Sequence, residues 1–144
     1  MGDVEKIYKN RSKITKLVEL MKDFPQVDCP VRHHFAPGCY IREIFMPKDS
    51  YVIGKIHATE HFNIILKGCV TVITAEGSNQ YFAPSTFVSE GGVQKVVYMH
   101  EDCIWQTVHV TDKTDIEEIE KEVIVKSYDQ LEIDGLVEKV KRLT

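Results

Sequence analysis

The chain has 144 residues, of which 43% are hydrophobic and 28% are charged. These values indicate one folded domain with a core of its own. The formal net charge of −4 argues against a strongly basic nucleic-acid binder, and no apolar run approaches the ~18 residues of a membrane-spanning helix. The acidic excess belongs to residues 112–144, which hold 10 acidic and 6 basic residues, whereas residues 1–111 hold 12 of each.

The first residues, MGDVEKIYKN, lack the apolar segment of a secretory signal, so we expect a cytoplasmic protein. The four cysteines form no Cys-x-x-Cys pair, which argues against a zinc ribbon or a thioredoxin-like motif. In a reducing compartment they are expected to remain thiols that pack as small hydrophobic side chains.

Residues 3–23 have the spacing of an amphipathic helix, and the Phe24-Pro25 pair is expected to end it. Its polar face is basic and includes Lys9, Lys13 and Lys16. We expect this helix to dock on the domain through its apolar face. The alternative is that the basic face binds a membrane or a partner helix.

A β domain is predicted to follow. Residues 25–38 contain three prolines and a glycine and are expected to be irregular. From Cys39 onward the hydrophobic period falls to about 2, which predicts seven or eight short strands. Several of them are apolar on both faces, which indicates a closed antiparallel sandwich or barrel. The predicted strands cover residues 39–46, 51–57, 61–67, 69–75, 79–82, 86–89, 93–99 and 103–110.

The C-terminal segment is predicted to be helical. Thr114 followed by Glu117 matches a capping box in front of an apolar stripe. A second short helix is expected over residues 134–143. We therefore divide the one folding domain into an N-terminal helix (1–24), a β-barrel (25–111) and a helical segment (112–144).

Three histidines stand where neighbouring strands could bring them together. His57 ends one predicted strand and His61 begins the next, so their imidazoles can converge on one ion. His109 shares a face with Trp105 and Thr107 on the last predicted strand. Three neutral imidazoles plus water would form an open site for Zn²⁺, Fe²⁺, Mn²⁺ or Ni²⁺.

Residues 54–68 resemble the first motif of the cupin superfamily, small antiparallel β-barrels of the jelly-roll (double-stranded β-helix) type that often bind one divalent metal. Counted back from Gly68, His61 takes the place of the motif's glutamate, His57 that of the second histidine and Lys55 that of the first. Residues 89–94 resemble the second motif loosely, with Gln94 at its histidine position. The resemblance covers about residues 38–110 and implies a single cupin-like barrel, mainly β, flanked by helices.

The whole-chain pattern also resembles small cupin-like proteins encoded by bacteriophages and prophages. The segments that carry this likeness are residues 32–38, 54–61, 83–84 and 105–109, followed by an acidic helix. That group has no assigned reaction, so the resemblance implies a fold and a phage origin and leaves the activity open.

The leading functional hypothesis is a divalent-metal site in a small-molecule pocket, centred on His57, His61 and His109, with Lewis-acid or oxygen-activating chemistry. One alternative is a non-catalytic module that binds an anionic, nucleotide-like or sugar-like molecule. Another is a structural or partner-docking protein, and the helices outside the barrel predict a homodimer or a larger homo-oligomer. The side chains expected to bind the small molecule are Lys55, Asn63, Gln94, His34 and Tyr98.

Overall fold

The computed structural model describes residues 11–17, 19–20 and 27–125. Residues 11–17 and 19–20 are helical, in agreement with the described part of the first predicted helix. The rest of that helix and the predicted helix over 134–143 lie outside the described residues. Within the described part of the chain, no helix is long and apolar enough to cross a membrane.

The first sheet contains five antiparallel strands in the order β1-β2-β10-β5-β8. Because β10 lies between β2 and β5, His109 stands opposite Tyr40 and Thr107 stands opposite Arg42. This register places polar residues of β2 and β10 side by side on the inner wall of the barrel. The strands are β1 (Val31–Ala36), β2 (Cys39–Met46), β5 (His61–Lys67), β8 (Ser85–Ser89) and β10 (Cys103–Val110).

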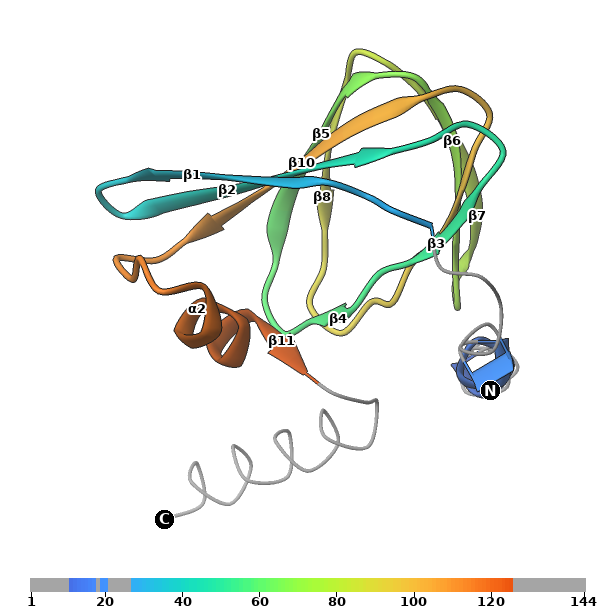
Figure 1. Ribbon diagram of the computed structural model, residues 1–144. Coiled ribbons are helices and arrows are strands. Elements are labelled where there is room, and N and C mark those ends of the chain that lie inside the picture. Colours follow the sequence, from blue (N-terminus) through green and yellow to red (C-terminus); the bar gives the residue numbers. More distant parts are fainter. Residues whose placement is uncertain (1–10, 18, 21–26, 126–144) are drawn as a thin grey trace.

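The second sheet contains four strands in the order β3-β9-β6-β7 and faces the first (Figure 1). Its strands are β3 (Tyr51–Ile53), β6 (Cys69–Thr74), β7 (Gly77–Phe82) and β9 (Val96–Met99). Burial of apolar side chains between the two layers is the main stabilising contribution to such a structure. The buried cluster between them comprises Met46, Ile65, Val70, Val72, Val97, Met99, Cys103 and Trp105.

The alternation along β5 shows how the sequence specifies these layers. His61, Asn63 and Ile65 are buried, whereas Phe62 and Leu66 are exposed. A strand places successive side chains on opposite faces, so one face of β5 lines the interior. The predicted mainly-β, antiparallel jelly-roll architecture is confirmed.

The prediction of irregular structure over residues 25–38 is wrong, because residues 31–36 form β1. This strand pairs with β2 across a turn at Gly38, whose φ of 76° suits glycine, and the hairpin projects from the barrel (Figure 1). Residues 32–36 are all exposed, so the strand depends on main-chain pairing at a sheet edge and carries no alternating apolar pattern.

The predicted strand over residues 51–57 is divided at Gly54. The Gly54 N–H donates to the carbonyl of Lys95, and its own carbonyl accepts a hydrogen bond from the Gln94 side chain. After this point the chain leaves the four-stranded sheet and forms β4 (Ile56–His57), which pairs with β11 (Ile124–Val125). The second half of the predicted strand therefore belongs to a separate two-stranded sheet.

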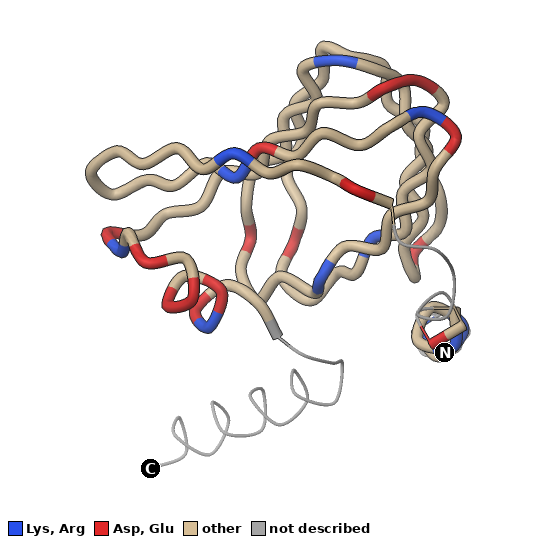
Figure 2. Tube along the Cα trace, in the orientation of Figure 1, with Lys and Arg blue, Asp and Glu red and all other residues tan. Residues whose placement is uncertain are grey.

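The helix α2 (Ile116–Val123) begins one residue later than the predicted capping box implies. Its N-cap is Asp115, whose carboxylate accepts hydrogen bonds from the N–H groups of Glu117 and Glu118, so the proposed cap at Thr114 is wrong. Acidic residues gather along this helix (Figure 2). The negative charge near its N-terminus is favourable because the helix dipole is positive there.

A second apolar cluster attaches α2 to the barrel. Tyr40 of β2 is buried with Ile119 and Val123 of the helix, and Ile116 and Ile124 pack against them. The helix lies next to β4 and β11 (Figure 1). It therefore covers the barrel where His57 is located.

Candidate metal centre

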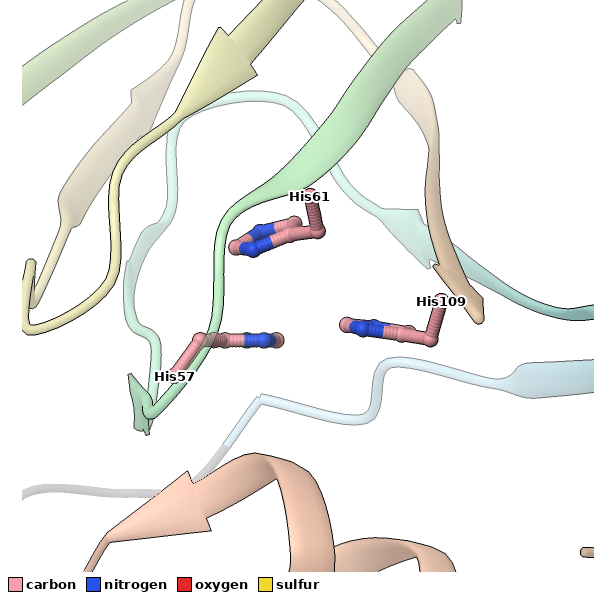
Figure 3. Close-up of side chains that lie close together, drawn as sticks. All are labelled: His57, His61 and His109. Atoms are coloured by element: carbon pink, nitrogen blue, oxygen red, sulfur yellow. The ribbon is translucent and has the colours of Figure 1, made fainter. Parts of the chain in front are cut away.

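His57 of β4, His61 of β5 and His109 of β10 point toward one another (Figure 3). The ring centroids are 4.3 Å apart for His57 and His61, 5.2 Å for His57 and His109, and 5.1 Å for His61 and His109. Each ring offers one nitrogen to a set whose members all lie within 4.8 Å of one another. The structure thus brings together the three histidines that the sequence singled out.

One buried ring nitrogen on each histidine has no hydrogen-bond partner: Nδ1 of His57, Nε2 of His61 and Nδ1 of His109. Buried polar atoms in proteins are almost always satisfied by a partner, so three such atoms close together are suited to bind one ion. The opposite nitrogens of two rings have partners. His61 Nδ1 lies 3.0 Å from the carbonyl oxygen of Thr59, and His109 Nε2 lies 3.1 Å from Oγ1 of Thr107.

These contacts favour the tautomers that metal binding requires. When His61 Nδ1–H donates to the Thr59 carbonyl, the lone pair is left on Nε2, which faces the other rings. When His109 Nε2–H donates to Thr107, the lone pair is left on Nδ1. Histidines that bind metals are commonly oriented in this way, with the second ring nitrogen held by a carbonyl or another acceptor.

The surroundings keep all three imidazoles neutral. Burial lowers the pKa of His57 to about 2, with further contributions from His61, His109, Lys95 and Arg42. Burial likewise lowers the pKa of His109 to about 4. The pKa of His61 is lowered by burial against the opposing effect of the Thr59 carbonyl. Neutral imidazole is the form that coordinates a metal.

This donor set fits a first-row transition metal. Imidazole suits zinc, iron, nickel and copper, and three histidines with a free position are typical of catalytic sites. Nitrogens bound to one ion at about 2.1 Å lie at most about 4 Å apart, so a small side-chain adjustment brings the three rings into a binding geometry.

A cavity of about 200 Å³ adjoins the triad and includes His57 and His109 in its lining. Most of its wall is apolar and is contributed by both sheets and by α2, through residues such as Ile44, Met46, Val97, Ile119 and Val123. An apolar cavity with a few convergent polar groups is the usual form of a small-molecule site.

Two of the predicted ligand-binding residues, Lys55 and Asn63, line this cavity but already have partners. Lys55 Nζ lies 3.8 Å from Oε1 of Glu120 on α2. The Asn63 amide donates to Ser89 Oγ at 2.7 Å and accepts from Trp105 Nε1 at 3.1 Å. Asn63 therefore connects β5 to β8 and β10.

The other three predicted ligand-binding residues, Gln94, His34 and Tyr98, do not line this cavity. The Gln94 amide donates to the Gly54 carbonyl at 3.1 Å. His34 lies on the exposed hairpin, 3.6 Å from Glu43. The Tyr98 hydroxyl donates to Asp49.

Sequence reasoning missed two basic residues of the cavity, Arg42 and Lys95. Arg42 could have been found, because it alternates in phase with Tyr40, an aromatic residue of the same predicted strand. Lys95 lies in the predicted strand over residues 93–99 and alternates there in phase with Val97, but in the structure the chain is irregular before β9, and the Lys95 carbonyl accepts a hydrogen bond from the Gly54 N–H.

Comparison with solved structures identifies the architecture. A cupin superfamily protein from Desulfitobacterium hafniense aligns with a TM-score of 0.51 at 6% identity, over 62% of this chain and 84% of that one. The Cupin_2 domain of an XRE family transcriptional regulator from Enterobacter cloacae aligns with a TM-score of 0.50 at 6% identity, over 59% of this chain and 98% of that one. The fold is cupin-like. Identities this low show the fold alone, and neither a family model nor a curated protein sequence matches the chain.

Within this cupin-like barrel the triad differs from the pattern suggested by the two motifs. His57 and His61 come from the stretch that resembles the first motif, whereas Gln94, in the stretch that resembles the second, binds the Gly54 carbonyl. The third imidazole is supplied by His109 of β10. The site is therefore a set of three histidines from β4, β5 and β10.

Proposed function

We propose that this cupin-like protein binds one divalent transition-metal ion through His57, His61 and His109 and uses the site to bind or transform a small molecule in the adjoining cavity. The observation that carries the proposal is the convergence of three buried, unpartnered ring nitrogens, one from each histidine. The candidate ions are Zn²⁺, Fe²⁺, Mn²⁺ and Ni²⁺.

A metal at this position would supply Lewis acidity and an open coordination position. The chain's own residues orient the imidazole rings and limit the access of water. Thr59 and Thr107 hold two of the rings so that their free nitrogens face inward. The apolar walls from both sheets and α2 limit access of water, which strengthens electrostatic interactions with a bound molecule.

Metal analysis of protein purified without a nickel column tests the proposal. We expect close to one equivalent of a transition metal per chain, falling below about 0.2 in His57→Ala and in His109→Ala, because a site left with two imidazoles binds far more weakly. His34→Ala is the matched control, since this histidine lies on the exposed hairpin and faces away from the triad.

Two results would count against metal binding. One is a metal content below about 0.2 per chain in the unmodified protein, unchanged after incubation with each of the four ions. The other is an equal loss of metal content in His57→Ala and in His34→Ala. A small molecule that copurifies with metal-free protein and is not turned over would instead support a non-catalytic binding module.

The cellular setting is also part of the proposal. A cytoplasmic location agrees with the four cysteines, all of which are free thiols. A phage or prophage origin follows the resemblance of the whole chain, and a homo-oligomer follows the helices outside the barrel. Expression of the gene during phage infection, and the mass of the purified protein in solution, would test these two points.

A further inference from the structure

The cavity beside the triad is electropositive, although the whole chain carries a net charge of −4. Its lining includes three basic side chains, Arg42, Lys55 and Lys95, against one acidic side chain, Glu120. Glu120 is paired with Lys55 at the exposed edge of α2. Two cations are therefore left in a cavity whose histidines are neutral.

Arg42 and Lys95 reach the cavity from opposite layers of the barrel. Arg42 lies on β2 in the five-stranded sheet, opposite Thr107 of β10. Lys95 immediately precedes β9 of the four-stranded sheet and is held by the hydrogen bond from Gly54 to its carbonyl. Both side chains line the cavity together with His57 and His109. The two cations thus share one cavity with the triad.

Among the described residues, neither cation has an acidic partner. The carboxylate next to Arg42 in sequence, Glu43, points to the outer face of β2, where it accepts a hydrogen bond from Gln106 and lies 3.6 Å from His34. Burial lowers the pKa of Lys95 to about 8. Two like charges in a partly dry cavity disfavour each other, and a bound anion would offset both.

We propose that the ligand of this site is a small carboxylic acid whose carboxylate lies between Arg42 and Lys95 and whose apolar body lies against the α2 side of the cavity. The proposal rests on the proposed function for the place of the ligand, but the carboxylate contacts use the chain's own cations and need no metal. The planar guanidinium of Arg42 matches the two oxygens of a carboxylate, and Lys95 adds a second positive charge.

A carboxylate fits these groups better than a phosphate does. A phosphate monoester carries up to two charges and three acceptor oxygens, and it is usually met by more donors than two side chains provide. The cavity of about 200 Å³ has a largely apolar wall, including Ile116, Ile119 and Val123 of α2. This wall favours a compact acid with an apolar body over a nucleotide or a sugar.

The test compares benzoate with benzamide, which has nearly the same shape and no charge. Binding of each is measured by ligand-observed NMR titration on the full chain, both as purified and after removal of metal with EDTA. We expect benzoate to bind at least about tenfold more tightly than benzamide in both preparations, since a charge-assisted hydrogen bond contributes at least that factor. Arg42→Gln and Lys95→Met should each reduce the preference about tenfold.

Lys67→Gln is the control, because Lys67 is an exposed lysine at the end of β5 and does not line the cavity. Circular dichroism establishes that the variants fold, and Arg42→Lys, which keeps the charge, should retain part of the preference. The proposal would be overturned if benzoate did not bind or bound no more tightly than benzamide. It would also be overturned if Lys67→Gln reduced the preference for benzoate as much as Arg42→Gln does. Displacement of benzoate by inorganic phosphate more readily than by acetate would also overturn it.

Metal content is measured in parallel, so that the two proposals can fail separately. Full metal occupancy without a preference for benzoate would remove the carboxylate ligand and leave the metal centre. A preference for benzoate that Arg42→Gln abolishes, in a protein that binds no metal, would support the carboxylate ligand and remove the metal centre.

Discussion

Ile124 lies opposite His57 in the register of β11 and β4, so the strand that follows α2 is paired with the strand that carries one of the three imidazoles. The N–H of the next residue, Ala58, donates to the carbonyl of Val123 at the end of the helix. The backbone around His57 is therefore held by the α2–β11 segment. Since metal ligands must be placed to within a fraction of an ångström, docking of α2 is expected to affect the affinity of the triad.

The first prediction concerns Ile119→Ala. Ile119 is 1% exposed and packs α2 against Tyr40, so its truncation should destabilise the protein by about 2–5 kcal/mol. It should also weaken zinc binding by on the order of tenfold, because β4 is less well held. Urea unfolding and a competitive zinc titration measure the two effects.

Ile73→Ala is the matched control, because Ile73 is 38% exposed on β6, away from α2. It should lower the free energy of unfolding by less than Ile119→Ala does, and it should leave zinc affinity unchanged. A destabilised Ile119→Ala variant with unaltered zinc affinity would show that α2 stabilises the barrel without positioning His57.

The second prediction concerns Asn63, which is fully buried and hydrogen-bonded at both ends. Asn63→Ala leaves the Trp105 N–H and the Ser89 hydroxyl without their partner, at a cost of about 1–3 kcal/mol for each group left unsatisfied. Trp105 is the only tryptophan, so its fluorescence reports the change directly. Metal content should remain that of the unmodified protein.

Asn79→Ala is the comparison for this variant, because Asn79 is exposed on β7. It should change stability by less than about 0.5 kcal/mol. If Asn63→Ala left stability intact and instead reduced ligand binding, the prediction that Asn63 is a ligand-binding residue would be supported.

The fold could be predicted from the sequence where a strand has one buried face and one exposed face. β5 has this form, and on β10 the buried residues Cys103, Trp105 and His109 lie on one face, so the faces that carry His61 and His109 followed from alternation alone. β1 could not be found in this way, because it is an exposed edge strand with no apolar pattern. The two-residue strands β4 and β11 exist only through their mutual pairing.

The candidate site could also be predicted only in part. The triad followed from a pair of histidines at a strand connection and a third on an inward face. Gln94 was chosen from the loose likeness to the second cupin motif, but its amide binds the Gly54 carbonyl, and the hydroxyl of Tyr98 on β9 donates to Asp49. Lys55 lines the cavity as expected, but its partner Glu120 comes from α2, which no local pattern could reveal.

The third prediction concerns the oligomeric state. Phe62 of β5 and Val88 of β8 lie directly opposite each other on the outer face of the five-stranded sheet and are 53% and 48% exposed, with Leu66 49% exposed nearby. Contiguous apolar surface of this kind is common at protein interfaces. We expect a homodimer at micromolar concentration in mass photometry, and we expect Phe62→Glu to shift the protein toward monomer.

Phe82→Glu is the control for this variant. Phe82 is 65% exposed but lies on β7 of the other sheet. It should leave the dimer intact. A pure monomer before any substitution would contradict the prediction, and dissociation by Phe82→Glu but not by Phe62→Glu would place the interface on the four-stranded sheet.

The last prediction is that the metal-free protein loses stability as the pH falls below neutrality. The triad imidazoles titrate near pH ~6.5 in the unfolded chain, whereas burial lowers their pKa in the folded state, to about 2 for His57 and to about 4 for His109. Above pH ~6.5 both states hold these rings neutral, and below it only the unfolded state takes up protons. The free energy of unfolding therefore falls with pH, by up to about 1.4 kcal/mol per pH unit for each imidazole.

Urea unfolding in EDTA at pH 7.5, 6 and 5 measures this slope. Other groups also titrate in this range, so the informative quantity is the difference between the unmodified protein and His109→Asn, which has one fewer neutral imidazole to protonate on unfolding. The variant should show the shallower loss of stability. Identical slopes for the two proteins would mean that the triad is accessible to protons in the folded state, in conflict with the buried, unpartnered nitrogens on which the metal centre rests.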